Sequence, residues 1–67
     1  MFDSNKFDEA VQKSGLKKRY LAEQIGMSYD TFLKKTGGVV EWKVGEAQAV
    51  SKVLRISVAE RNAIFFA

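Results

Sequence analysis

The sequence predicts a compact all-α domain of four to five helices. Three observations favour this class: a length of 67 residues leaves room for one small core, proline is absent, and apolar residues recur at helical spacing between glycine stops. Hydrophobic residues make up 46% of the chain, which argues against disorder. We therefore expect a single domain over residues 1–67, without linkers or internal repeats.

The first helix is predicted to begin after Asp3, a residue type that caps helix N-termini through its side-chain oxygen. Phe2, before this cap, and Phe7, inside the helix, are spaced to close a hydrophobic staple. The helix should end at Ser14-Gly15, where glycine permits the left-handed conformation. Its apolar face comprises Phe7, Ala10 and Val11.

Two short helices joined at Gly26 are predicted next. The second helix runs from about Lys17 or Lys18 to Ile25, and Gly26 ends it because glycine readily adopts positive φ. Ser28 is the expected cap of the third helix. A joint this short forces the two helices to cross steeply, so the pair is predicted to form a helix-turn-helix.

The rest of the chain predicts two further helices. Gly37-Gly38 should end the third helix, and we expect Trp42, in the following loop, to fill the core rather than to contact a ligand. A fourth helix is predicted from near Val44 to about Arg55. The segment 57–60, SVAE, is a capping box that begins a short fifth helix. The residues expected to face the core from the fourth helix are Ala47, Val50, Val53 and Leu54.

Positive charge is concentrated on the predicted helix-turn-helix. Residues 13–35 hold six basic and two acidic side chains, a net charge of +4, whereas the other 44 residues carry a net charge of −1. A basic surface of this kind attracts the phosphate backbone of nucleic acids. The pattern therefore favours double-stranded DNA as the partner, because a helix-turn-helix places one helix in the major groove.

Cysteine and histidine are both absent, which removes the usual zinc ligands, thiol nucleophiles and histidine-based acid-base chemistry. We expect neither enzyme activity nor a metal or cofactor. No apolar run approaches the roughly 20 residues of a membrane span, and no secretion signal opens the chain. These features predict a soluble, intracellular protein without a small-molecule substrate.

A set of residues in a particular order resembles a known family. The residues are Leu16, Leu21-Ala22, Ile25-Gly26, Ser28, Thr31-Phe32, Gly38, Glu41-Trp42 and the segment LRISVAERNAIFF. From Gly15 to Phe66 the chain is similar to helix-turn-helix regulators of the lambda repressor and Cro type, most closely to short phage and prophage regulators. The resemblance implies a lambda repressor-like fold and sequence-specific binding of operator DNA, at the nucleoid in the cytoplasm of a bacterial host cell.

The resemblance also implies which side chains meet DNA. The third helix, about residues 28–36, would enter the major groove and meet base edges through Tyr29, Asp30, Thr31 and Lys34. Asp30 either accepts from a cytosine amino group or orients Lys34 at (i, i+4) spacing. Lys35 stands where the family has an apolar residue, so either Leu33 supplies part of the packing or Lys35 snorkels. The expected phosphate contacts are Lys17, Lys18, Arg19, Lys35 and Lys43.

The apolar end of the fifth helix predicts a dimer interface. Ile64, Phe65 and Phe66, followed by Ala67, are consecutive, so they point in all directions and one small core should not cover every ring. We expect a weak homodimer that assembles on DNA through Ile64, Phe65 and Phe66. In the opposite arrangement Phe66 folds back into the core and Phe65 alone stays exposed.

Two other functions remain open for the same fold. The first is a protein-interaction module, such as an antirepressor or a phage inhibitor, which Asp30 and Leu33 on the reading face favour. The second is an antitoxin that binds both DNA and a toxin. The clustered positive charge favours transcriptional regulation by DNA binding over the interaction module.

Overall fold

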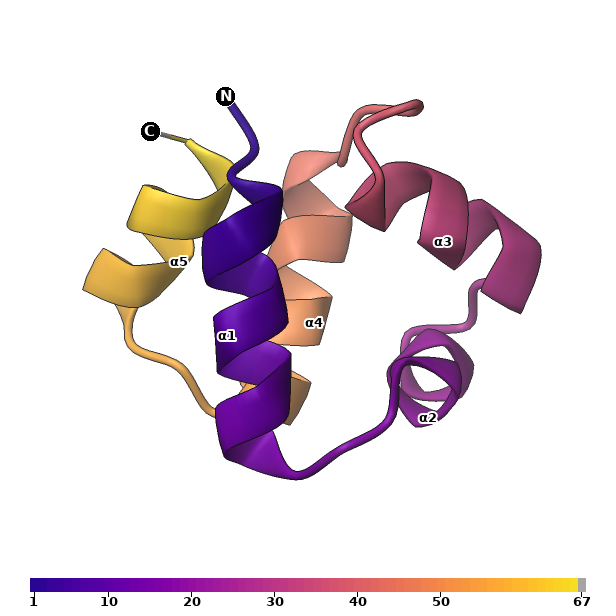
Figure 1. Ribbon diagram of the computed structural model, residues 1–67, viewed down its shortest axis with the longest axis horizontal. Helices are drawn as coiled ribbons and strands as arrows, with labels where there is room; N and C mark the ends of the chain where they lie inside the picture. The colour runs from indigo at the N-terminus through magenta and orange to yellow at the C-terminus, as the bar shows by residue number, and fades with distance from the viewer. Residues whose placement is uncertain (67) are drawn as a thin grey trace.

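The computed structural model describes residues 1–66, and over that range it contains five helices and no strand (Figure 1). The prediction of an all-α domain is therefore confirmed. Each predicted helix is present, with ends that differ from the expected ones by at most a residue or two. The helices are α1 (Ser4–Ser14), α2 (Lys18–Gln24), α3 (Tyr29–Thr36), α4 (Val44–Leu54) and α5 (Val58–Phe65).

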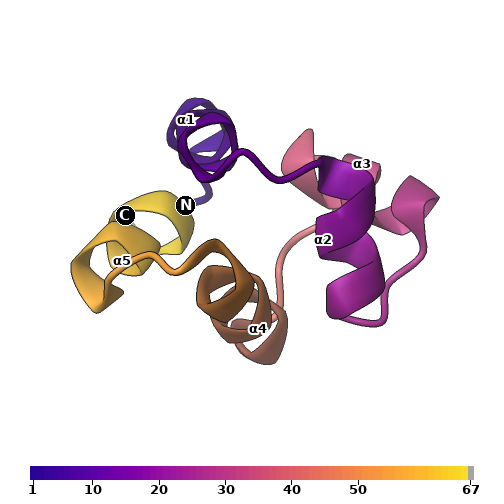
Figure 2. The ribbon, with the colours of Figure 1, turned by 90° about the horizontal axis from the view of Figure 1, so that it is seen from below.

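The helices form two groups that differ in orientation. α1, α4 and α5 contact one another, and α2 packs against both α3 and α4. Figures 1 and 2 show α1, α4 and α5 on one side of the molecule and α2 with α3 on the other. α2 is seen end-on in Figure 1 while α3 lies across the view, so these two neighbours cross steeply.

Helix ends follow the capping residues that the sequence offers. The carboxylate of Asp3 accepts from the N–H of Lys6 at 3.1 Å, and Ser28 Oγ accepts from the N–H of Thr31 at 3.2 Å. In the predicted capping box of α5, Ser57 Oγ accepts from the N–H of residue 60 at 3.1 Å. Side chains therefore satisfy backbone donors that have no partner within the helix.

Aromatic rings fill the centre of the core. Phe7 and Phe32 have no exposed surface, and their ring centroids lie 6.1 Å apart. Trp42 is partly buried and stands edge-on to Phe32, with centroids 5.7 Å apart. The indole therefore packs against the core as expected, although it also borders solvent. The buried hydrophobic residues are Phe7, Ala10, Val11, Leu21, Ala22, Phe32, Ala47, Val50, Leu54, Ile64 and Phe65.

The C-terminal rings are arranged differently from both expectations. Ile64 and Phe65 are only 3% and 6% exposed, whereas Phe66 is 47% exposed. The Phe65 ring lies 5.4 Å from Phe2 and 5.3 Å from Trp42, measured between centroids. One ring is left uncovered, that of Phe66, whereas the expectation that Ile64 and Phe65 lie in a dimer contact was wrong because both side chains are buried in the core. The N-terminal segment and the loop before α4 cover the Phe65 ring. Ala67 lies outside the described residues.

Candidate nucleic-acid interface

The joint between α2 and α3 is short and tightly held. Ile25 caps α2, Gly26 has a φ of 72°, and the N–H of Met27 donates to the carbonyl of Ala22 at 2.9 Å. Glycine adopts this φ without the steric penalty that other residues meet. The joint therefore turns the chain within a few residues and sets the direction of α3 against α2.

α3 has a buried side and an outer side. Phe32 anchors the helix in the core, while Asp30, Leu33 and Lys34 are exposed. Thr31 is half-buried, and its Oγ1 accepts from the hydroxyl of Ser28 at 2.9 Å. The outer side thus presents groups that donate and accept hydrogen bonds, which reading of base edges requires.

Lys34 and Asp30 form an ion pair on this outer side. Lys34 Nζ lies 3.2 Å from Asp30 Oδ2, and the two side chains are 55% and 80% exposed. The (i, i+4) arrangement is the one expected for orientation of Lys34. A pair this exposed stabilises a helix by only about 0.2 to 0.5 kcal/mol, so other partners can displace it.

Arg19 and Tyr29 contact each other across the joint. The guanidinium carbon of Arg19 lies 4.2 Å from the centroid of the Tyr29 ring. Arg19 is exposed, whereas Tyr29 is half-buried and packs against the core. The two residues were expected at the interface for separate reasons, and the structure brings them together.

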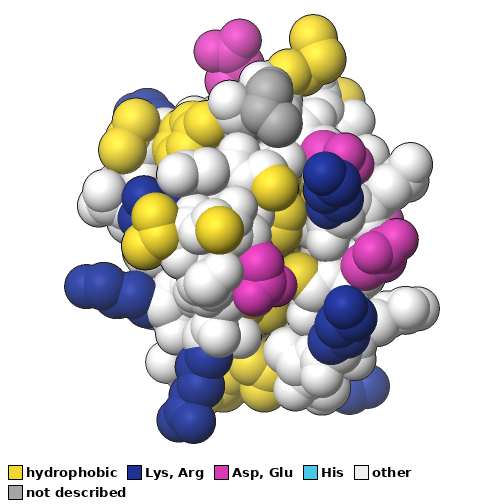
Figure 3. Space-filling view, turned by 90° about the vertical axis from the view of Figure 1, so that its left-hand side faces the viewer, with side chains coloured by type: hydrophobic (Ala, Val, Ile, Leu, Met, Phe, Trp, Pro, Cys, Tyr) yellow, Lys and Arg dark blue, Asp and Glu magenta, His cyan; other side chains and the backbone are white. Residues whose placement is uncertain are grey.

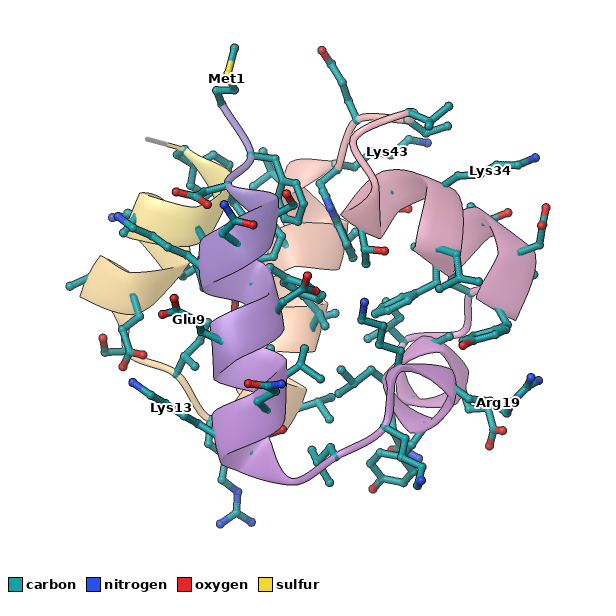
Figure 4. The ribbon with its side chains drawn as sticks, viewed as in Figure 1. Met1, Glu9, Lys13, Arg19, Lys34 and Lys43 are labelled. Carbon is teal, nitrogen blue, oxygen red and sulfur yellow. The ribbon has the colours of Figure 1, made fainter. Side chains whose placement is uncertain are left out.

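Several exposed cations lie on the side of the molecule formed by α2 and α3. Figure 4 shows Arg19 and Lys34 pointing outward from α2 and α3, with Lys43 close to α3 at the start of α4. Lys17 is exposed at the N-cap of α2. Lys13, although part of the basic segment, lies on the other side of the molecule, where it lines a groove between α1 and α5. The structure thus divides the basic segment between two surfaces.

The opposite surface carries charges of both signs. Figure 3 shows hydrophobic side chains in a depression, with basic and acidic side chains around it. The groove between α1 and α5 has a volume of about 240 Å³. Its lining residues are Lys6, Glu9, Ala10, Lys13, Glu60, Ala63 and Ile64. The two glutamates of this groove offset its two lysines, whereas basic residues outnumber acidic ones on α2 and α3, so the surface of α2 and α3 suits nucleic acid better.

Lys18 is less available to phosphate than expected. Its Nζ lies 3.2 Å from Asp8 Oδ1 on α1, and its side chain is only about one-third exposed. No sequence pattern indicates this pair, since the two residues are ten positions apart on different helices. A phosphate at Lys18 would have to approach the carboxylate of Asp8 as well.

Lys35 was expected to contact phosphate, and that expectation was wrong. The residue is 5% exposed, and its Nζ donates to Glu46 Oε1 at 2.6 Å and to the carbonyl of Glu41 at 3.1 Å. The side chain points inward because it follows the buried side of α3 toward α4. Its charge is matched there by the carboxylate of Glu46.

Glu46, like Asp8, is a partner residue that the sequence did not predict. Its Oε1 also accepts from the backbone N–H of Lys43 at 2.9 Å. Burial alone would raise the pKa of the Glu46 carboxyl, but the hydrogen bonds from Lys35 and from the N–H of Lys43, with the charges of both lysines, lower it below its ordinary value. The carboxylate therefore joins α3, the loop and α4 while remaining ionised.

Within residues 1–66, no three acidic side chains gather where they could bind a metal ion. Over the same range, every helix is too short or too polar to cross a membrane.

Comparisons with known proteins give no match: no protein-family model, no curated protein and no solved structure is similar to this chain. The geometry and the residues of the α2 and α3 surface therefore carry the functional argument. The resemblance to lambda repressor and Cro-type regulators remains an expectation from the sequence.

Proposed function

We propose that this protein is a sequence-specific DNA-binding regulator of transcription, in which α2 and α3 act as a helix-turn-helix. The observation that carries the proposal is the outer side of α3, where Asp30 and Lys34 are exposed on the same side of the molecule as the cations Arg19 and Lys43. α3 has eight residues, and a helix of this length spans about 12 Å, comparable to the width of the major groove. Binding over a promoter would block transcription, as expected for a Cro-like or repressor-like switch of a phage or prophage.

The ion pair between Lys34 and Asp30 does not oppose this proposal. Breaking the pair costs about 0.2 to 0.5 kcal/mol, whereas a good contact from lysine to guanine discriminates by about 1 to 3 kcal/mol. Lys34 is therefore free to exchange the carboxylate for a base. Asp30, once released, is then available to a cytosine amino group.

Selection of bound sequences from random duplex DNA tests the proposal most directly. The expected result is one enriched motif, which would be a near-palindrome if two protomers bind together. Enrichment of no sequence, at salt concentrations low enough to favour phosphate contacts, would contradict the proposal. That result would favour the protein-interaction module, which the exposure of Asp30 and of Leu33 on the same side of α3 supports.

Substitutions at two lysines should weaken DNA binding in different ways. Lys34→Ala is expected to cost about 1 to 3 kcal/mol, mainly through one base pair of the selected sequence. Lys17→Ala should instead weaken binding to all duplexes alike and reduce the salt dependence by about 0.9 in the slope of log K against log salt. Fluorescence anisotropy with the selected site, its single-base variants and a random duplex would measure both effects.

Lys13→Ala is the matched control for these variants. It removes the same charge from the side of the molecule that bears the groove between α1 and α5, so it should alter binding little. Equal losses for Lys34→Ala on the selected and the random duplex would show that Lys34 does not read a base.

We also propose that the protein forms a weak homodimer that assembles on DNA, with Phe66 in the contact. Phe66 borders a groove whose lining includes the apolar side chains of Phe2, Val40 and Trp42. When two protomers associate through such a groove, the exposed ring is removed from water, which favours the dimer. A two-fold pair would place its half-sites about 34 Å apart, one turn of DNA.

The expected result is that Phe66→Ser folds normally but binds the selected site without cooperativity between protomers. Loss of the ring removes apolar contact area, while its 47% exposure means that the core is little affected. Sedimentation with and without DNA would count the bound protomers. One protomer at saturation of the wild-type complex, or undiminished cooperativity in Phe66→Ser, would exclude this contact.

A further inference from the structure

The contact between Arg19 and Tyr29 links the first turn of α2 to the first turn of α3. The guanidinium carbon stands 4.2 Å from the ring centroid, well within the range of a cation–π contact. Tyr29 is partly buried against the core, and Arg19 is exposed. One residue is thus fixed by packing, and the other is a long side chain that would otherwise sample many rotamers in solvent.

We infer that Tyr29 is a positioning residue: its ring holds the Arg19 guanidinium beside the joint of α2 and α3, ready to bind a DNA phosphate. This inference rests on the proposed DNA-binding function. Stacking uses the face of the guanidinium and leaves its N–H donors free around the edge. Those donors match two oxygens of one phosphate, which a lysine ammonium matches less well.

The inference assigns Tyr29 a different role from the base contact expected from the sequence. A ring that supports Arg19 affects affinity for all DNA sequences, because phosphate contacts carry no base information. A phenol that contacts a base would instead affect specificity. The hydroxyl is needed for the second role, whereas only the ring is needed for the first.

A double-mutant cycle with Arg19→Gln and Tyr29→Leu tests the inference on a duplex of random sequence. Tyr29→Leu should weaken binding about two- to fivefold in the wild-type background, the size expected from an exposed cation–π contact. In the Arg19→Gln background the same substitution should have no effect. Arg19→Gln should also lower the salt slope by about 0.9, since one phosphate contact is lost.

Two control variants make the cycle specific. Tyr29→Phe keeps the ring and should bind as the wild type does. Lys17→Gln removes a neighbouring exposed cation, and its effect should simply add to that of Tyr29→Leu. In the free protein, NMR signals of the Arg19 side chain should be shifted by the ring in wild type and in Tyr29→Phe, and the shift should disappear in Tyr29→Leu.

Three results would overturn the inference. Equal losses from Tyr29→Leu with and without Arg19 would show that Tyr29 acts on its own. A loss in Tyr29→Phe as large as in Tyr29→Leu would assign the effect to the hydroxyl. Failure of the wild-type protein to bind any duplex at low salt would overturn the proposed function and this inference together, whereas the first two results leave DNA binding itself intact.

Discussion

Replacing Trp42 with alanine is expected to unfold the domain. The indole contacts the rings of Phe2, Phe7, Phe32 and Phe65, with centroid distances between 5.3 and 5.8 Å. Truncation of a large aromatic side chain in a core costs about 3 to 5 kcal/mol. A domain of this size rarely has more than about 3 to 5 kcal/mol of total stability, so the loss is comparable to the whole.

Circular dichroism during thermal and urea unfolding would measure this effect. The matched control is Val39→Ala, which removes an apolar side chain from the same loop at a position that is 78% exposed. We expect the control to unfold like the wild type. A Trp42→Ala variant that stays folded but lacks the proposed DNA binding would assign the indole to the proposed DNA-binding surface instead of the core.

Replacing Lys35 with methionine is expected to give the second-largest loss of stability. The substitution removes the charged partner of the Glu46 carboxylate at 2.6 Å, and loss of a charged hydrogen-bond partner by a partly buried group costs about 1 to 3 kcal/mol. The double variant Lys35→Met, Glu46→Gln removes the stranded charge and should recover part of the loss. Urea unfolding at neutral pH would compare the three proteins.

The pH dependence of stability should separate these variants further. Because the pKa of Glu46 is lowered in the folded protein, its ionised form adds stability above the ordinary glutamate pKa, and this stability is lost as the pH falls through the lowered pKa. Glu46→Gln should therefore flatten the acid limb of the stability curve. In Lys35→Met, burial raises the pKa of the Glu46 carboxyl and only the contact to Lys43 lowers it. The loss of stability on acidification should therefore become smaller than in the wild type, or turn into a gain.

These curves would be measured as urea midpoints between about pH 3 and pH 6, the range in which glutamate titrates. Identical acid limbs for wild type and Glu46→Gln would contradict the assigned role of Glu46. Equal stability of Lys35→Met and wild type at neutral pH would mean that the ion pair contributes nothing measurable.

The helices and their ends could be predicted because their causes are local. Asp3, Ser28 and the capping box at Ser57 act on backbone groups within three residues, and the turn at Gly26 depends on one residue's φ. Such signals need no knowledge of how the helices pack. The steep crossing of α2 and α3 follows from the same short-range information.

The side-chain partners could not be predicted, because they depend on packing between helices. Glu46 is eleven residues from Lys35, and Asp8 is ten residues from Lys18, so no periodic pattern connects the members of each pair. Charge counting along the chain was misleading for the same reason. It treated Lys13 as part of one basic surface, although the fold turns that residue to another side.

The two ends of the described chain meet at one pole of the molecule, where the N–H of Asp3 donates to the carbonyl of Ile64 at 2.7 Å. Figure 1 shows this pole beside α1 and α5, away from the outer side of α3. A fluorophore or an affinity tag attached at either end would therefore leave the outer side of α3 open. The attached group would instead lie close to Phe66, in the proposed dimer contact. Tagged protein therefore suits tests of the proposed DNA binding, whereas untagged protein is needed to count protomers.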